Sequence, residues 1–333
     1  MSKQLPYVEP LFCTYHYLAN HGVVAQQNPT GYIWFLNNCI QLHCSNQFLT
    51  GYGDLKLSVT TQGFFFNPNI EMYATSSRFC SAEMPTLIKR MIDEDFYIIF
   101  NNLDDYYVEG KSFYQERHFY HDGLIIGYDD EENTFSFVAY DKTMNYRPFK
   151  VSDCSLKEAI SKSLEAGEVP RFLAVKSYNY PEELDYSQII DSLNDYLNPK
   201  EAKNLEGDVN GVDIYESVIL YLDKLSDQSI SHDKMDWRIM RLIWEHKKCM
   251  LLRIQEIEKD LSFSNEASFA YQKIVEESKI LHILYAQHHF KAQDRLLSVM
   301  KKKLENIADW EKQQLTEFLY KLKNEVKNAL EVD

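Results

Sequence analysis

Residues 121–141 form the stretch that most constrains how this chain can fold. Residues 121–129 read His-Asp-Gly-Leu-Ile-Ile-Gly-Tyr-Asp, and residues 134–141 read Thr-Phe-Ser-Phe-Val-Ala-Tyr-Asp. Both runs are crowded with apolar residues, and the polar segment 129–133 between them is typical of a turn. The pattern predicts a β-hairpin, with His121 entering the first strand and Asp141 ending the second.

A histidine and a carboxylate on neighbouring strands can supply the general base and the orienting group of a nucleophilic triad. Cys13 is the candidate nucleophile, because residues 13–20 predict a short helix that ends at Gly22 as its C′ residue. At a helix N-terminus, backbone N–H groups and the helix dipole favour a thiolate and can hold an oxyanion. Taken singly, each of the three residues is better explained by a structural role. Their chain order and placement together favour catalysis by Cys13, His121 and Asp141.

A polar and aromatic segment before the hairpin supplies the candidate substrate-binding residues. His118 lies three residues before His121, so strand alternation turns it to the opposite face, and it is the rival histidine. Asp104 and Asp105, beside Tyr107, are suited to a cationic or amine-bearing substrate. The alternative for these carboxylates is a solvated rim with no ligand.

Charge and cysteine usage narrow the functional classes. The chain has 35 Lys and Arg against 50 Asp and Glu, a formal net charge of −15, which argues against a nucleic-acid partner. Residues 1–6 show no apolar signal core, and no run is long enough to cross a bilayer, so we expect a soluble, cytoplasmic protein with no membrane partner. The six cysteines form no CxxC pair, so neither a metal site nor a disulfide framework is expected.

Periodicity divides the chain in two. Helices early and strands late, including strands near 96–100 and 171–176, predict a mixed α+β domain over residues 1–180. From residue 181 onward, long amphipathic segments predict an α-helical bundle or appendage over 181–333, with a polar linker near 198–211.

These residues carry a resemblance to a known family. The segment 13–16 (Cys-Thr-Tyr-His), the run 105–107, the segment 117–121 (Arg-His-Phe-Tyr-His) and the run 124–130 that contains Gly-Tyr-Asp-Asp resemble the N-terminal domain of the butirosin biosynthesis protein H family. That family is similar to papain-like and bacteriocin-leader peptidases. The resemblance covers about residues 5–178, and it implies a papain-like cysteine-peptidase-type fold, with N-terminal helices and an antiparallel sheet, followed by a helical region.

The resemblance implies an acyltransferase of natural-product biosynthesis. An acyl or aminoacyl group would pass from the phosphopantetheine thioester of a carrier protein, through an acyl-cysteine, to a small-molecule amine such as an aminoglycoside. By position, Cys13 would be the nucleophile, His121 the general base and acid, and Asp141 its orienting group, with no cofactor bound by the chain itself. Papain-like peptidases place a glutamine six residues before the cysteine, where this chain has Tyr7; Gln4 is out of register.

The helical region would cover the cleft, bind the carrier protein or form a homodimer. Its one compact basic run, 301–303, is more typical of a solvated helix face than of a carrier-protein dock. Two other functions stay open. One is a cysteine peptidase or amide hydrolase with the same triad, and the other is a non-catalytic binding protein on a papain-like scaffold.

Overall fold

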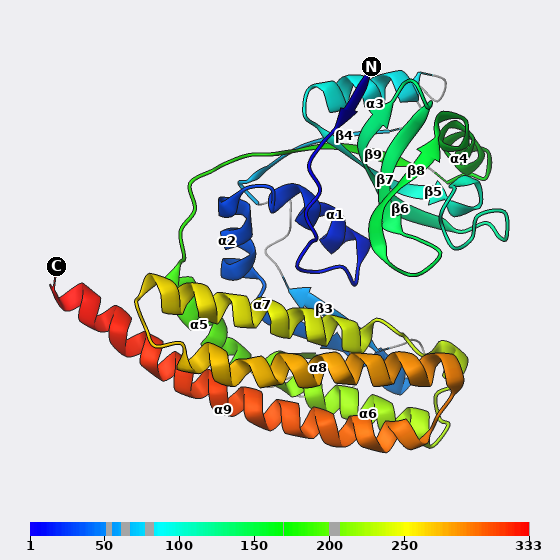
Figure 1. Ribbon diagram of the computed structural model, residues 1–333. Coiled ribbons are helices and arrows are strands. Elements are labelled where there is room, and N and C mark those ends of the chain that lie inside the picture. The colour runs from blue at the N-terminus through cyan, green and yellow to red at the C-terminus, as the bar shows by residue number, and fades with distance from the viewer. Residues whose placement is uncertain (51–54, 61–66, 77–82, 169, 200–206, 333) are drawn as a thin grey trace. The chain divides into compact units, whose positions relative to one another are not determined.

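The computed structural model describes residues 1–50, 55–60, 67–76, 83–168, 170–199 and 207–332 (Figure 1). It is a mixed α+β structure with antiparallel sheets and a C-terminal helical region. The chain divides into two compact units, one of Met1–Tyr32 with Phe64–Glu182 and one of Ile33–Gly63 with Glu183–Asp333. Among the helices so described, none combines the length and the apolar character needed to span a membrane.

The first unit is built on a seven-stranded sheet with strand order β4-β9-β5-β6-β7-β8, and β1 pairs with the C-terminal end of β6. Every pair in this sheet is antiparallel. The strands are β1 (Ser2–Gln4), β4 (Ile70–Ser76), β5 (Tyr97–Asp104), β6 (Tyr120–Asp129), β7 (Thr134–Tyr140), β8 (Tyr146–Ser152) and β9 (Arg171–Ser177). The helices of this unit are α1 (His16–Ala25), α3 (Met84–Asp93) and α4 (Asp153–Glu165), while α2 (Pro29–Asn38) crosses the division between the units. Helix α1 packs on β6 and β9, whereas α3 and α4 pack on β5 (Figure 1).

The predicted hairpin of residues 121–141 is confirmed as β6 and β7, with Asp129 opposite Thr134 across the turn. The Gly-Tyr-Asp run at the end of the first strand makes contacts that stabilise the fold. A Cβ on Gly127 would lie 2.7 Å from the carbonyl oxygen of Lys3, so only glycine lets β1 approach. Tyr128 donates to the Asp93 carboxylate at 2.8 Å, and Asp129 accepts two backbone N–H groups of the turn.

The helix predicted from Cys13 to Asn20 is displaced along the chain. Helix α1 begins at His16 and continues through Gly22 to Ala25. Gly22 is therefore not a C′ residue. Its missing side chain serves close packing instead, since a Cβ there would lie 2.7 Å from the Cβ of Pro10.

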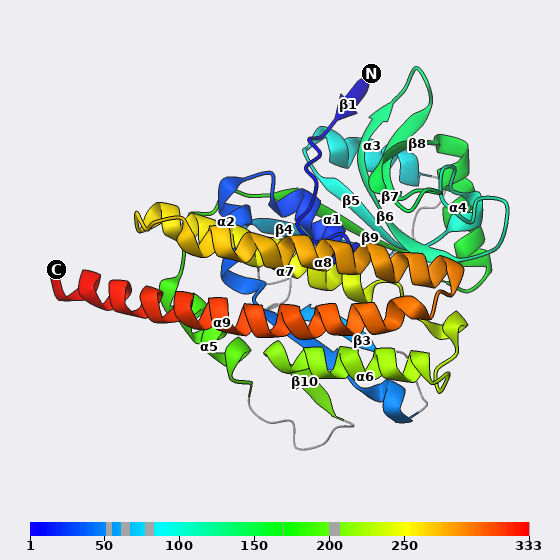
Figure 2. The same ribbon diagram turned by 60° about the horizontal axis from the view of Figure 1, so that its bottom comes forward.

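The second unit joins a three-stranded sheet to a group of long helices. Strand β2 (Gln41–Ser45) lies between β3 (Lys56–Thr60) and β10 (Asp208–Asn210). The helices are α5 (Tyr186–Leu197), α6 (Ile214–Ser226), α7 (Ile239–Asp260), α8 (Glu266–Lys291) and α9 (Arg295–Val332). Helices α7, α8 and α9 pack along one another, and α9 also packs on α5 and α6 (Figure 2).

The segment 33–63 belongs with these helices, which differs from a simple division at residue 180. Strand pairing to β10 holds it there, and so do hydrogen bonds from helix α7. The ring of His246 donates to the Ile40 carbonyl at 2.8 Å, and Arg253 donates to the carbonyls of Leu36 and Cys39. The predicted linker 198–211 is also shorter than expected, because Asp208–Asn210 forms β10; residues 200–206 lie outside the described part of the chain.

Candidate active site

Cys13 lies in the segment that leads into α1, three residues before the first helical residue. Its side chain is buried, and its thiol points at the Pro10 carbonyl with Sγ 3.6 Å from the oxygen. The helix starts late because Tyr15, the N-cap residue, has extended backbone angles (φ −122°, ψ 137°). The thiol is thus upstream of the first helical turn rather than inside it, while still next to the positive end of the helix.

His16 connects the cysteine segment to the strand histidine, a role that the sequence analysis missed. Its ring lies edge-on to the ring of His121 at 4.1 Å and to the ring of Tyr140 at 5.2 Å between centroids. The Tyr140 hydroxyl in turn donates to the carbonyl of Cys13. The start of α1, the start of β6 and the end of β7 therefore meet around His16. The only signal for this in the sequence is that His16 follows Cys13 by three residues.

Tyr7, which stands at the glutamine position of the papain-like pattern, lies on the same side of the fold as the cysteine. Its hydroxyl donates to the Tyr146 carbonyl at 3.2 Å. Burial, reinforced by the nearby Cys13 and Glu9, raises the pKa of Tyr7 to about 12. Gln4 lies elsewhere, on β1, where its side chain donates to the Leu5 carbonyl. Tyr7 is thus the only side chain of this pair that is in position to influence the thiol.

His121 lies on β6 opposite Leu103, and its side chain is 37% exposed. Its Nδ1 lies 3.9 Å from Oδ2 of Asp105, an ion-pair distance that is longer than a hydrogen bond. The Phe119 ring packs beside it at 5.1 Å between centroids. The imidazole is thus held between aromatic rings with a carboxylate near one nitrogen, which is a suitable environment for a general base.

Asp141 has partners other than the expected histidine. Its carboxylate accepts hydrogen bonds from Thr143 (backbone and hydroxyl), the Asn145 backbone and the Arg147 side chain. Burial would raise the pKa of Asp141, but these donors lower it to about 2.

The backbone pairing of β6 with β7 ends at Leu124 and Val138. The ladder therefore stops before it would hold His121 opposite Asp141.

The other predicted substrate residues form a separate cluster at the end of β5. His118 Nδ1 lies 2.7 Å from Oδ2 of Asp104, whose side chain is 1% exposed, whereas the His118 side chain is 58% exposed. The Tyr106 ring stacks on His118 at 4.6 Å, and Tyr107 lies at a tilt 6.0 Å away. Asp104 and Asp105 are both buried, so they are not a solvated rim, and each already faces a basic side chain.

Lys111 is the second residue that the sequence did not reveal. Its Nζ lies 3.0 Å from Oδ1 of Asp105, and both side chains are nearly inaccessible to solvent. Burial raises the pKa of Asp105 to about 6 in spite of the Lys111 charge, and it lowers the pKa of Lys111. A single lysine in a loop gives no pattern from which such a pairing could be read.

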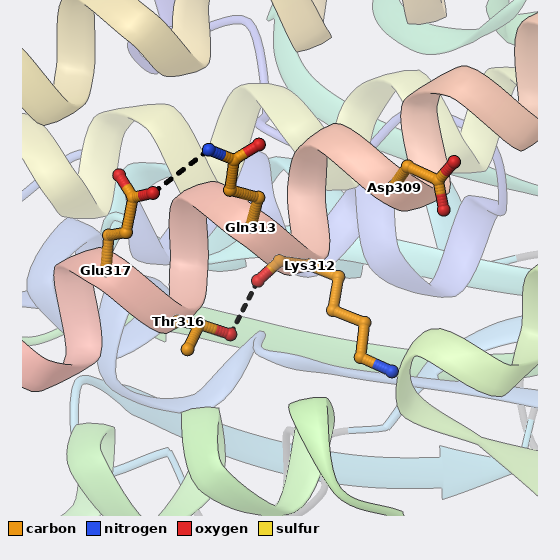
Figure 3. Close-up of a pocket in the computed structure, with 5 residues that line it drawn as sticks. All are labelled: Asp309, Lys312, Gln313, Thr316 and Glu317. Carbon is orange, nitrogen blue, oxygen red and sulfur yellow. Dashed lines mark hydrogen bonds between the residues drawn. The ribbon is translucent and has the colours of Figure 1, made fainter.

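The remaining candidates for a site are a metal-binding cluster and a hollow on the surface. Within the described ranges, no group of three or more His, Cys, Asp or Glu side chains is arranged to hold a metal ion. A hollow of about 350 Å³ lies along α9, and the described residues that line it all belong to that helix (Figure 3). Two of these, Gln313 and Glu317, are hydrogen-bonded to each other at 3.0 Å. An exposed polar strip on one helix offers no converging groups for catalysis.

Comparison of the sequence with models of protein families finds no match, and comparison with curated proteins finds none either. The geometry around Cys13 and His121 and the motif resemblance are therefore the two indications of function.

Proposed function

We propose that this chain is an acyltransferase of natural-product biosynthesis, on a papain-like domain, that moves an acyl or aminoacyl group from a carrier-protein thioester through Cys13 to an amine. One observation carries the proposal: His121 and Tyr140 both pack on His16, and Tyr140 is hydrogen-bonded to the backbone of Cys13. An antiparallel strand that bears the histidine, together with a helix that follows the cysteine, is the arrangement of papain-like enzymes. The resemblance of these same segments to the butirosin biosynthesis protein H family supports acyl transfer by Cys13 and His121 rather than another reaction of these two residues.

The reaction needs two steps at the thiol. In the first, the Cys13 thiolate attacks the thioester carbonyl, and the pantetheine thiol leaves with a proton from His121. In the second, the acceptor amine attacks the acyl-cysteine, His121 takes the amine proton, and the amide leaves as Cys13 is restored. Backbone N–H groups at the start of α1 would stabilise the oxyanion in both steps.

Cys13 is a buried residue, 7% exposed, and restricted access of bulk water to an acyl group there would favour transfer over hydrolysis. The runner-up is a cysteine peptidase or amide hydrolase that uses the same pair. A non-catalytic binding protein also predicts a buried cysteine, so the chemical reactivity of Cys13 decides between these classes.

A carrier protein would require a basic patch, and the run 301–303 does not supply an open one. Lys301 pairs with Asp223, and Lys303 pairs with Glu277, both within the helical unit. We therefore place no docking site there, and a homodimer through the helical region stays a prediction. A thiol nucleophile and a carrier-bound donor belong in a reducing compartment, so we propose the cytoplasm as the site of action.

The test is the intact mass of the protein after incubation with small acyl thioesters of pantetheine. We expect an added acyl mass in the wild type and none in Cys13→Ala, followed by its discharge when amine acceptors are added. Loss of the adduct in buffer without an amine would support the hydrolase. A wild-type protein that forms no adduct, with Cys13 inert to alkylation, would overturn the proposal in favour of a binding protein.

A further inference from the structure

Asp104 and Asp105 are consecutive carboxylates that face two different histidines. Asp104 lies 2.7 Å from Nδ1 of His118, and Asp105 lies 3.9 Å from Nδ1 of His121. Asp104 is the last residue of β5 and has extended backbone angles (φ −76°, ψ 105°), whereas Asp105 begins a 3-10 turn (Asp105–Tyr107). The two neighbouring carboxylates therefore lie next to different histidines.

A β-bulge decides which carboxylate serves which histidine. Phe100 pairs with Gly123, but after an irregularity in β5 the pairing resumes with Leu103 opposite His121. Asn102, in this irregularity, has the left-handed backbone angle φ 62°. A one-residue shift of register exchanges the two faces of a strand. Without the bulge, Asp104 would lie on the face that Asp105 now shares with His121.

Lys111 fixes the Asp105 carboxylate. Its Nζ lies 3.0 Å from Oδ1 and also donates to the Asp122 carbonyl at 3.2 Å, so the ammonium group is held from two directions. With one oxygen held by Lys111, the other oxygen, Oδ2, is the one directed at His121. The carboxylate and the ammonium group are both buried, which gives this pair a defined geometry that exposed pairs lack.

We propose that Asp105, fixed by Lys111, is the positioning carboxylate of His121, the part that the sequence pattern assigns to Asp141. The inference builds on the proposed role of His121 as the general base. The Asp141 carboxylate is already engaged by Thr143, Asn145 and Arg147. The 3.9 Å separation of Asp105 from His121 is longer than a hydrogen bond, and such contacts are often long in enzymes without substrate.

Nuclear magnetic resonance titration of the full-length protein, labelled with ¹³C at the histidine Cε1 atoms, tests this assignment. The signals of His118 and His121 are assigned from His118→Gln and His121→Gln. Asp105→Asn should lower the pKa of His121 by about half to one unit, because it removes the carboxylate charge 3.9 Å from the ring. Asp104→Asn and Asp141→Asn are the controls, and both should leave the pKa of His121 unchanged. A His121 pKa that follows Asp141→Asn and ignores Asp105→Asn would overturn the inference.

A second variant guards against misfolding. Asp105→Asn alone leaves the buried Lys111 charge without its partner, which is destabilising, whereas Asp105→Asn with Lys111→Met removes both charges. The pKa of His121 should fall in the double variant as well, by less, because the repulsion from Lys111 is removed too. Groups that face the pair from other elements, among them His16, Asp104 and Asp122, stay unchanged in both variants.

The two proposals fail in different ways. The titration is read on the resting protein and needs no acyl transfer. If Asp105→Asn lowers the pKa of His121 but the wild type forms no acyl adduct, the acyltransferase proposal is wrong and the pairing of His121 with Asp105 is still supported. If the acyl adduct forms but Asp105→Asn leaves the pKa of His121 unchanged, the acyltransferase proposal is supported and the pairing of His121 with Asp105 is wrong.

Discussion

Nζ of Lys247 lies 2.8 Å from Oε2 of Glu311, and neither side chain has any solvent-exposed surface. Three tyrosine hydroxyls also donate to this carboxylate, from Tyr196, Tyr215 and Tyr271. Burial lowers the pKa of Lys247, although the neighbouring Glu311 opposes this effect. The pair joins α7 to α9 inside the second unit, so the stability of that unit depends on both charges being matched.

Lys247→Met should destabilise the protein by about 3–5 kcal/mol, because it leaves Glu311 charged and buried. Lys247→Met combined with Glu311→Gln should cost less than the single change, since no charge is left and the tyrosines keep an acceptor. Urea unfolding, followed by tryptophan fluorescence, measures the free energy of unfolding of both variants. The matched control is Lys301→Met, which breaks the partly exposed pair with Asp223 and should cost no more than about 1 kcal/mol. A double variant as unstable as the single one would contradict this account.

The stability of the first unit should depend on pH through His21. Burial lowers the pKa of His21 to about 4, although the ring donates from Nδ1 to the Tyr17 carbonyl. A histidine whose folded-state pKa is lowered stabilises the fold above its unfolded-state pKa, and this contribution is lost as the pH falls toward 4. Between pH 7 and pH 5 the wild type should lose about 2 kcal/mol through this group, and His21→Asn should lack that loss. Urea unfolding at several pH values tests this, and equal pH slopes for the two proteins would refute it.

Gly127→Ala should detach β1 from the sheet. The new methyl group would lie 2.7 Å from the Lys3 carbonyl oxygen, which belongs to the backbone and cannot rotate away. We expect a cost of about 1–3 kcal/mol and faster amide exchange at Leu5, whose N–H donates to Ile126 at 2.7 Å. Gly167→Ala is the control: its methyl group meets no atom within 4 Å, and φ of +86° gives only local strain. Unchanged exchange at Leu5 in Gly127→Ala would show that β1 tolerates the methyl group.

His121→Gln and His118→Gln form a matched pair for the general base. If His121 activates the thiol, its loss should slow alkylation of Cys13 by iodoacetamide at pH 7 at least about tenfold. Loss of His118, whose ring belongs to the Asp104 cluster, should change the rate less than about twofold. Peptide mass spectrometry reads Cys13 separately from the exposed Cys154, which serves as an internal reference. If alkylation of Cys13 is slowed in His118→Gln but not in His121→Gln, then His118 is the general base.

The local elements of this protein follow from its sequence. Alternating apolar residues and a polar turn predicted the hairpin of β6 and β7. Ser152, a residue type that is favoured at helix N-caps, caps α4 by accepting a hydrogen bond from the Ser155 N–H. Strand propensity, caps and turns act over a few residues, so a short window of sequence contains the information that decides them.

The tertiary structure decided which of these elements belong together. Segment 33–63 joins the helical unit because strand β2 finds its partner in β10, far along the chain. The bulge at Asn102 gives Asp105 rather than Asp104 the face of His121, and Lys111 reaches the same carboxylate from a loop. Pairing partners, register and buried charge contacts depend on distances between residues that are remote in sequence. Local patterns therefore identified Cys13 and His121 as candidates, and only the folded chain revealed the neighbours of each.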